Sequence, residues 1–244
     1  MKLSIIIPVY NEKNFILEVI KKIHAVSFPD EIKEFEIVVV DDFSKDGTTS
    51  ILEKNKQNLN YNLVILTQNS GKGYAIREGI KKSTGDIIII QDADFELIPD
   101  DMPLMLKTMF TLNVEFVNGS RYMTGIIRPL YSYRRYFFNK MFTKFASILI
   151  NVRLTDLACG YKLFSRNIYN QIILKENRFG FEAEFLIKIA RLKKTLIAEV
   201  PVHYFPREIE QGKKIKNIDG LKIMWTILKY SLFTKAKNFK KHHN

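Results

Sequence analysis

The stretch "GDIIIIQDADFELIPD", residues 85–100, runs four consecutive isoleucines into Asp92, Asp94 and Glu96. A short, continuous run of β-branched apolar residues predicts a strand that is buried on both faces. Similar runs precede it, namely "LSIIIPV" (3–9), "FEIVVVDD" (35–42) and "NLVILTQN" (62–69). Segments with helical spacing of apolar residues separate these runs. The alternation predicts an α/β fold whose mostly parallel sheet is covered by helices on both faces.

Polar side chains follow each of the four predicted strands. In an open parallel sheet, ligands bind beyond the carboxyl ends of the strands. The residues at those ends are Tyr10, Asn11 and Glu12, then Asp41 and Asp42, then 69–73, then Asp92, Asp94 and Glu96. Polar strand ends also occur simply because they meet water, but so many acidic ends favour a ligand. We therefore expect the four ends to meet at one crevice.

The spacing of Asp92, Asp94 and Glu96 predicts a metal site. In extended backbone, residues i, i+2 and i+4 point to the same side. Carboxylates held so close together repel one another unless a cation neutralises them. Oxygen ligands suit Mg²⁺ or Mn²⁺. Taken alone, an Asp-x-Asp sequence is also compatible with a solvated loop, but its place after a buried strand favours the metal.

Two further strand ends carry candidate ligand groups. Asp41, Asp42 and Ser44, in "VVVDDFSKDGT", could bind hydroxyls or a base edge, although Ser44 could instead cap a helix. In "NSGKGYAIREG", glycines allow backbone to approach a ligand, and Lys72 could meet a phosphate. This segment is neither a Walker loop nor a dinucleotide-binding glycine motif.

Charge is distributed unevenly along the 244 residues, whose formal net charge is +12. Residues 1–115 carry a net charge of −5 and residues 116–244 a net charge of +17, which points to an anionic partner for the second half. The candidates are nucleic acid, a phosphorylated small molecule and an anionic membrane surface. No nucleic-acid-binding signature is present, and an acidic crevice argues against that partner. The single cysteine, Cys159, excludes a disulfide framework and fits a cytoplasmic location.

Aromatic and basic residues alternate in "RPLYSYRRYFFNKMFTKFASILI" (128–150), and residues 217–233 have an amphipathic pattern. We expect both segments to form helices. Helices of this composition anchor at a membrane surface without spanning it, and a basic tail, 234–244, adds electrostatic attraction. We expect a peripheral protein on the cytoplasmic face of a membrane. The alternatives are that these aromatics fill the core or an oligomer interface.

Taken in order, "SIIIPVYNE", "VVVDDFSKDGT", "GKGYAIREG" and "DIIIIQDAD" resemble family 2 inverting glycosyltransferases with the GT-A fold. "GSRY", "LTDLACGYKLFSR", "NRFGFEAEFLIKIAR" and "EVPVHYFPREIEQGKKIKNIDG" resemble the branch of polyprenyl-phosphate (dolichol-phosphate) mannose and glucose synthases. The resemblance implies one GT-A domain over 1–233, with a nucleotide-sugar half (1–119) and an acceptor half (120–233).

The resemblance also implies roles for individual residues. It implies that Pro8, Tyr10 and Glu12 line the nucleotide base pocket and that Asp41 also holds the nucleotide. We further expect Asp42, Ser44, Lys72, Asp92 and Ala93 to bind the nucleotide sugar at the same crevice. Asp92 and Asp94 match the metal-linked pair, and Glu96 stands where relatives often have glutamine. Arg121 matches an arginine that binds phosphate, Arg207 and Lys213 match a basic pair over the diphosphate, and Asp156 matches the catalytic base of other members. Cys159 and Gly160 receive no role.

The implied reaction moves a hexose from GDP-mannose or UDP-glucose to a polyprenyl phosphate, with inversion and with Mg²⁺ or Mn²⁺. A lipid phosphate is largely ionised at pH 7, its second pKa being near ~6 as in phosphate esters. It needs positioning by Arg121, Arg134 and Arg135 more than it needs a base. The alternative is transfer to a sugar hydroxyl of a surface glycan or lipid-linked oligosaccharide, for which Asp156 would be the general base. An oligomer is compatible with either function.

Overall fold

The computed structural model describes residues 1–126, 129, 132–178, 180–192, 197–207 and 217–239. Its strands are β1 (Lys2–Val9), β2 (Glu34–Asp41), β3 (Asn62–Ile65), β4 (Ile87–Ile90), β5 (Phe116–Ser120), β6 (Lys162–Ser165) and β7 (Ile197–Pro201). The α-helices are α1 (Ile16–His24), α2 (Thr48–Asn55), α3 (Lys72–Lys82), α4 (Met102–Leu112), α5 (Tyr133–Ile150), α6 (Arg166–Asn170), α7 (Phe181–Leu192) and α8 (Asn217–Leu228). Shorter helical turns are η1 (Pro99–Asp101), η3 (Lys229–Phe233, a π-helix) and η4 (Ala236–Phe239).

The strands form one sheet in the order β3-β2-β1-β4-β6-β5-β7. All pairings are parallel except those of β6, which is antiparallel to both β4 and β5. The prediction of an α/β fold with a mostly parallel sheet is therefore confirmed. In the described segment 197–207, β7 alone pairs with the sheet.

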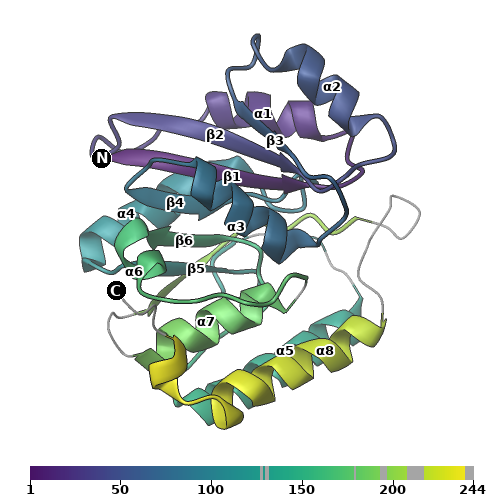
Figure 1. Ribbon diagram of the computed structural model, residues 1–244. Helices are drawn as coiled ribbons and strands as arrows, with labels where there is room; N and C mark the ends of the chain where they lie inside the picture. Colours follow the sequence, from purple (N-terminus) through teal and green to yellow (C-terminus); the bar gives the residue numbers. More distant parts are fainter. Residues whose placement is uncertain (127–128, 130–131, 179, 193–196, 208–216, 240–244) are drawn as a thin grey trace.

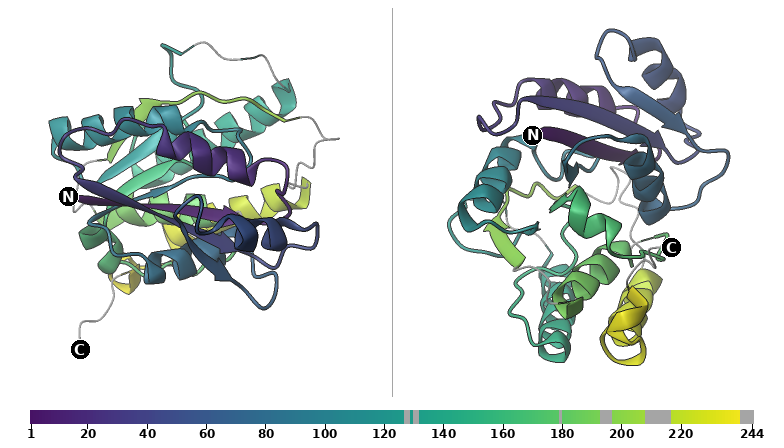
Figure 2. Two further views of the ribbon diagram at one scale, coloured as in Figure 1. Left: turned by 90° about the horizontal axis from the view of Figure 1, so that it is seen from above. Right: turned by 60° about the vertical axis from the view of Figure 1, so that its left-hand side comes forward.

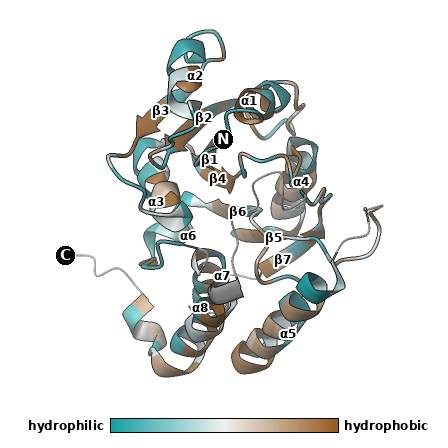
Figure 3. Ribbon diagram, turned by 90° about the vertical axis from the view of Figure 1, so that its right-hand side faces the viewer, coloured by the Kyte–Doolittle hydropathy of each residue, from teal (hydrophilic) through white to brown (hydrophobic). Residues whose placement is uncertain are grey.

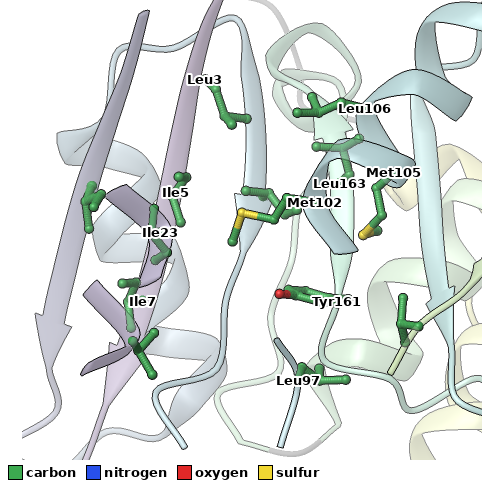
Figure 4. Close-up of a cluster of buried hydrophobic side chains, with 14 of the residues drawn as sticks. Leu3, Ile5, Ile7, Ile23, Leu97, Met102, Met105, Leu106, Tyr161 and Leu163 are labelled. Atoms are coloured by element: carbon green, nitrogen blue, oxygen red, sulfur yellow. The ribbon is translucent and has the colours of Figure 1, made fainter. Parts of the chain in front are cut away.

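Helices cover both faces of this sheet (Figure 1). One core lies under α1 and α4, and Figure 4 shows its side chains, including Ile5, Met102 and Tyr161, between the strands and those helices. The second core lies on the opposite face, where α3, α5 and α7 pack. Both faces of the central strands are apolar because each face is covered.

The topology brings the strand ends together. The chain order reverses between β1 and β4, which is where ligands bind in sheets of this kind. Because β6 runs antiparallel, the loop that precedes it, 155–161, lies at the same edge as the carboxyl ends of β4 and β5. Since β7 is parallel to β5, residues 202–207 also emerge at this edge.

Helices α5 and α8 lie side by side beneath α7, on the side away from α1 and α2 (Figure 2). The helix expected over 128–150 begins at Tyr133, and residues 127–128 and 130–131 lie outside the described residues. The segment expected as one helix over 217–233 is α8 continued by the π-helical turn η3. Residues 240–244 of the basic tail are likewise outside the described residues.

We expect Gly79→Ala to destabilise the protein, because α3 approaches the sheet through this glycine. A Cβ at Gly79 would lie 2.6 Å from Ile6 Cγ2 and 2.9 Å from Val40 Cγ2. Overpacking of this kind costs about 1–3 kcal/mol, which exceeds the gain of roughly 1 kcal/mol in helix propensity. The measurement is the midpoint of urea unfolding.

Gly220→Ala, in α8, is the matched control, since a Cβ there would meet nothing closer than 3.7 Å. It should leave the urea midpoint unchanged or raise it. Equal midpoints for the two variants would contradict close packing of α3 on the sheet.

Candidate functional site

A cavity of about 580 Å³ opens at the carboxyl edge of the sheet. Its walls are formed by the segments that follow β1, β2, β3, β4, β5 and β7 and by the loop that precedes β6. The lining residues that carry polar or charged side chains are Tyr10, Glu12, Asp42, Asn69, Lys72, Asp92, Asp94, Glu96, Arg121, Arg178, Glu182, Tyr204 and Arg207. The apolar and glycine lining includes Pro8, Ala93, Leu97, Ala158, Gly160 and Ile223.

The acidic segment after β4 is a turn, so the prediction of an extended backbone through Asp92, Asp94 and Glu96 was wrong. Phe95 lies in the left-handed region at φ 59°, and Asp94 Oδ1 accepts a hydrogen bond from the Glu96 backbone N–H at 3.1 Å. All three acidic residues still line the cavity. Among the described residues, no group of three or more acidic, His or Cys side chains is arranged to hold a metal ion.

Hydrogen bonds from three side chains fix the acidic turn. Gln91 Nε2 donates to Leu97 O at 2.9 Å, and Tyr161 Oη donates to Ile98 O at 2.6 Å. Tyr204 Oη donates to Glu96 Oε2 at 3.1 Å. The turn is thus held on both sides, so the direction of its carboxylates is set before any ligand binds.

Arg207 connects three of the acidic side chains. Its guanidinium binds both carboxylate oxygens of Glu12, at 2.9 and 3.0 Å, and Asp94 Oδ2 at 3.0 Å, while its backbone N–H donates to Glu96 Oε1. Burial, together with the negative charges of Asp92 and Glu96, raises the pKa of Asp94 to about 6, although Arg207 acts in the opposite direction. Burial disfavours the charged form of Arg207, but Glu12 and Asp94 outweigh it and raise its pKa.

Lys72, the first residue of α3, forms ion pairs with two carboxylates. Its Nζ lies 2.6 Å from Asp92 Oδ1 and 2.8 Å from Glu182 Oε1, at the start of α7. Burial disfavours the ammonium form, but these two charges outweigh that effect and raise the pKa of Lys72. Gly160 packs against this pair, where a Cβ would clash with the Asp92 carboxylate. The close approach explains why a glycine stands at 160.

Asp41 and Asp42 hold loops at the cavity wall. Asp41 is fully buried, and its carboxylate accepts hydrogen bonds from the backbone N–H and hydroxyl of Ser44 and from the Thr49 hydroxyl. Asp42 accepts from the backbone N–H groups of Ser70 and Gly71, at 2.7 and 2.8 Å. Burial raises the pKa of Asp42. Asp42 lines the cavity, whereas Asp41 and Ser44 lie behind it.

Asp156 is fully buried and bound to Arg121. Arg121 donates to the carboxylate through Nε at 2.7 Å, through Nη2 at 3.0 Å and through its backbone N–H at 3.1 Å, and the Ala158 backbone N–H donates at 3.2 Å. Burial disfavours the charged guanidinium, but Asp156 outweighs it and raises the pKa of Arg121. Arg121 lines the cavity and Asp156 lies behind it. Asp156 therefore orients Arg121 in this structure.

Most of the sequence-predicted residues thus meet at one cavity: Pro8, Tyr10, Glu12, Asp42, Lys72, Asp92, Ala93, Asp94, Glu96, Arg121 and Arg207 line it. Asp41, Ser44 and Asp156 stand in the layer behind. Lys213 lies outside the described residues.

Glu182 and Arg178 line the cavity but were not predicted as site residues. The sequence does carry a signal for Glu182. It lies in "FEAEFLIKIARL", and an acidic residue in so apolar a helix must be paired if the helix is buried. Glu182 is only 6% exposed and pairs with Lys72. Arg178 follows an irregular segment in which no periodicity indicates its direction.

Comparison with known proteins gives consistent findings. The model of the family "Glycosyl transferase family 2" matches residues 4–173. Two proteins of Trichomonas vaginalis (strain ATCC PRA-98 / G3) are similar over almost the whole chain. Dolichyl-phosphate beta-glucosyltransferase ALG5D is 31% identical, over 94% of this chain and 73% of its own length. Dolichyl-phosphate beta-glucosyltransferase ALG5A is 30% identical, over 98% of this chain and 75% of its own length.

Among solved structures, glucosyl-3-phosphoglycerate synthase from Mycobacterium tuberculosis, in complex with Mn²⁺, uridine diphosphate and glucosyl-3-phosphoglycerate, has a similar fold. The TM-score is 0.68 at 19% identity, covering 94% of this chain and 80% of that one. The family match in sequence and the similarity in fold are consistent with each other. The chain belongs to glycosyl transferase family 2 and has the GT-A fold.

Proposed function

We propose that this enzyme transfers a hexose, with glucose as the first candidate, from a nucleoside-diphosphate sugar to a polyprenyl phosphate of the dolichyl type, with inversion. Both relatives are named dolichyl-phosphate beta-glucosyltransferase, which supports a dolichyl phosphate acceptor and favours glucose over mannose. They therefore also make UDP-glucose a better first donor to test than GDP-mannose. The bound uridine diphosphate of the M. tuberculosis synthase supports the same choice.

The single observation that carries the acceptor class is the hydrogen bonding of Asp156. A sugar hydroxyl needs a general base with a free carboxylate oxygen within reach. Both oxygens of Asp156 already accept hydrogen bonds, and the residue lies behind Arg121 with no exposure. An ionised phosphate needs no base, and a guanidinium oriented by Asp156 is suited to bind it. This arrangement favours the lipid phosphate over the glycan hydroxyl.

The carboxylates that follow β4 fit a divalent cation. Asp92 and Asp94 both line the cavity, and each is paired with a cationic side chain, Lys72 or Arg207. A site that already attracts cations, and that offers carboxylate oxygens, suits Mg²⁺ or Mn²⁺. We propose Asp92 and Asp94 as the residues that hold it. The cation would stabilise the negative charge of the departing diphosphate.

The residues around this site then bind the rest of the donor. Pro8, Tyr10 and the loop fixed by Asp41 and Asp42 lie where a base and ribose would fit, beside the switch between β1 and β4. Arg207 adds a positive charge near the leaving diphosphate. On this proposal, residues 1–119 supply most contacts to the nucleotide sugar, and residues 120–233 supply Arg207, Arg121 and the C-terminal helices.

The same helices present an apolar face that suits a membrane surface. Tyr133, Phe137, Met141 and Ile148 form one stripe on α5 and are 39–74% exposed. Leu221 and Trp225 on α8 are 74% and 59% exposed, and Figure 3 shows brown, apolar turns on both helices. Arg134, Arg135 and Lys144 are exposed beside the stripe, as expected for a helix at anionic headgroups.

In the part of the chain that the structure describes, no helix has the length and apolar character to cross a membrane. We propose that the protein binds the cytoplasmic face of a membrane through α5 and α8. Ile223 of α8 lines the cavity, so this surface lies next to the proposed acceptor site. A lipid phosphate could then enter without leaving the bilayer.

The first test is a transfer assay with polyprenyl phosphate, Mn²⁺ and radiolabelled UDP-glucose or GDP-mannose. We expect label from UDP-glucose to enter the chloroform-extractable lipid. Asp94→Asn should lower the rate at least about 100-fold, because charge stabilisation at the leaving group is lost. If the donor is hydrolysed and no lipid product forms, the polyprenyl phosphate acceptor is rejected, but the assignment to the glycosyltransferases stands.

The role of Asp156 gives a second test. We expect Asp156→Asn and Arg121→Gln each to raise KM for polyprenyl phosphate by about tenfold or more, since either removes a charge-assisted contact. Residues that act as one unit are non-additive, so the double variant should be little worse than either single one. The measurement is steady-state kinetics between about pH 6 and about pH 9, a range in which the deprotonation of a general base would change the rate. If Asp156→Asn instead lowers kcat at unchanged KM and abolishes a pH-dependent limb, Asp156 is the base.

The membrane surface gives a third test, by flotation with vesicles of phosphatidylcholine and phosphatidylserine. The double variant Phe137→Ser, Trp225→Ser should weaken binding at least about tenfold, because burial of one large apolar side chain contributes about 1.5–3 kcal/mol. Leu112→Ser is the matched control: it removes a side chain that is 57% exposed on α4, away from this face. An equal loss in the control would reject the α5–α8 surface.

A further inference from the structure

Arg207 is a cation held among carboxylates at the site proposed for a divalent ion. Its side chain is only 10% exposed. The guanidinium contacts Glu12 from the loop after β1 and Asp94 from the turn after β4. The Phe15 ring lies 5.3 Å from the guanidinium carbon. Arg207 is thus bound from several directions, although its own segment follows β7 at the far end of the sheet.

The contacts of Arg207 are unequal. Glu12 accepts from two guanidinium nitrogens in a bidentate pair, whereas Asp94 accepts from Nη2 alone. Bidentate arginine–carboxylate pairs are the stronger and more directional kind. Breaking the contact with Asp94 therefore leaves Arg207 held by Glu12, whereas breaking the contact with Glu12 would remove the stronger of these two carboxylate pairs.

We infer that Arg207 is the counter-ion of Asp94 while the cavity lacks a donor, and that a divalent cation must displace it from Asp94 to bind. Glu12 is then a positioning residue, which keeps the displaced guanidinium at the cavity wall. This inference rests on the proposed function only in taking a divalent cation as the group that Asp94 holds. It assigns Glu12 a place different from the nucleotide base pocket that the sequence implied.

The exchange has a physical reason. The Asp94 side chain is only 23% exposed, and a partly desolvated carboxylate without a cation is costly, so Asp94 needs Arg207 until the metal arrives. Arg207 in turn lowers the affinity of Asp94 for the metal alone, since a charge-assisted hydrogen bond must break. A nucleoside diphosphate brings negative charge that the released guanidinium can meet. Binding of metal without nucleotide is therefore the weaker event.

The test is the affinity for Mn²⁺ alone, measured by electron paramagnetic resonance in the absence of nucleotide, sugar and lipid. We expect Arg207→Gln to bind Mn²⁺ about tenfold more tightly than the unaltered protein, the size of one lost charge-assisted contact. Arg178→Gln is the matched control, because Arg178 also lines the cavity but donates to Asn69. Its affinity should change by less than about threefold, as expected from a solvent-screened charge.

Adding Asp94→Asn to Arg207→Gln must remove the gain, because the gain comes from the carboxylate that Arg207 releases. The inference is overturned if Arg207→Gln binds Mn²⁺ no more tightly, if Arg178→Gln gains as much, or if the gain survives without Asp94. Arg207→Lys keeps the positive charge but cannot hold Glu12 in two places. It should fall between the unaltered protein and Arg207→Gln, and it provides a folded variant if the glutamine variant is unstable.

These outcomes are separate from those of the transfer assay. Tighter Mn²⁺ binding by Arg207→Gln supports the exchange even if the acceptor is not a lipid phosphate. Conversely, transfer of glucose to polyprenyl phosphate can succeed while the Mn²⁺ affinities of the variants are equal. The second result would keep the proposed function and reject the exchange.

Discussion

Buried carboxylates at the edge of the sheet each require a cation or hydrogen-bond donors, and this requirement joins the two halves of the chain. Glu12 and Asp94, from the acidic first half, pair with Arg207, which stands 195 residues after Glu12. Lys72, also from the first half, pairs with Glu182 from the second, and Asp156 pairs with Arg121 within the second half. An uncompensated charge in such a place would be expensive. The loops of the cavity can therefore adopt these positions only together.

The antiparallel strand β6 makes the pairing of Asp156 with Arg121 possible. It enters the sheet between β4 and β5 and so brings the loop 155–161 to the edge where the parallel strands end. Asp156 and Gly160 precede the amino end of β6, whereas Asp92 and Arg121 follow the carboxyl ends of β4 and β5. Gly160 leaves room for the Lys72–Asp92 pair, because any side chain there would collide with the carboxylate.

The sequence predicts the first half of the site well, because buried parallel strands read as continuous apolar runs and their ends are marked by polar residues. Tyr10, Asp42 and Asp94 could all be placed at one crevice in this way. The direction of β6 could not, since "YKLFSR" carries no information about which neighbour it pairs with. The turn at Asp94 was missed because a positive φ at Phe95 is uncommon for a residue with a side chain. Glu182 was missed although an acidic residue in an apolar helix is a signal, because the sequence does not show that Lys72, 110 residues earlier, is its partner.

The positive charge of the second half has two destinations. Part of this charge lies inside the cavity, where Arg121 and Arg207 each neutralise a buried carboxylate and also line the cavity. Another part stays on the surface of α5, next to exposed aromatic side chains. Charge in the cavity can select a phosphate group, because it is desolvated and fixed. Charge on the helix can only attract an anionic surface, because it is exposed and screened by salt. The proposed lipid phosphate acceptor would use both, since its headgroup would bind in the cavity and its chain would remain in the layer that α5 and α8 would contact.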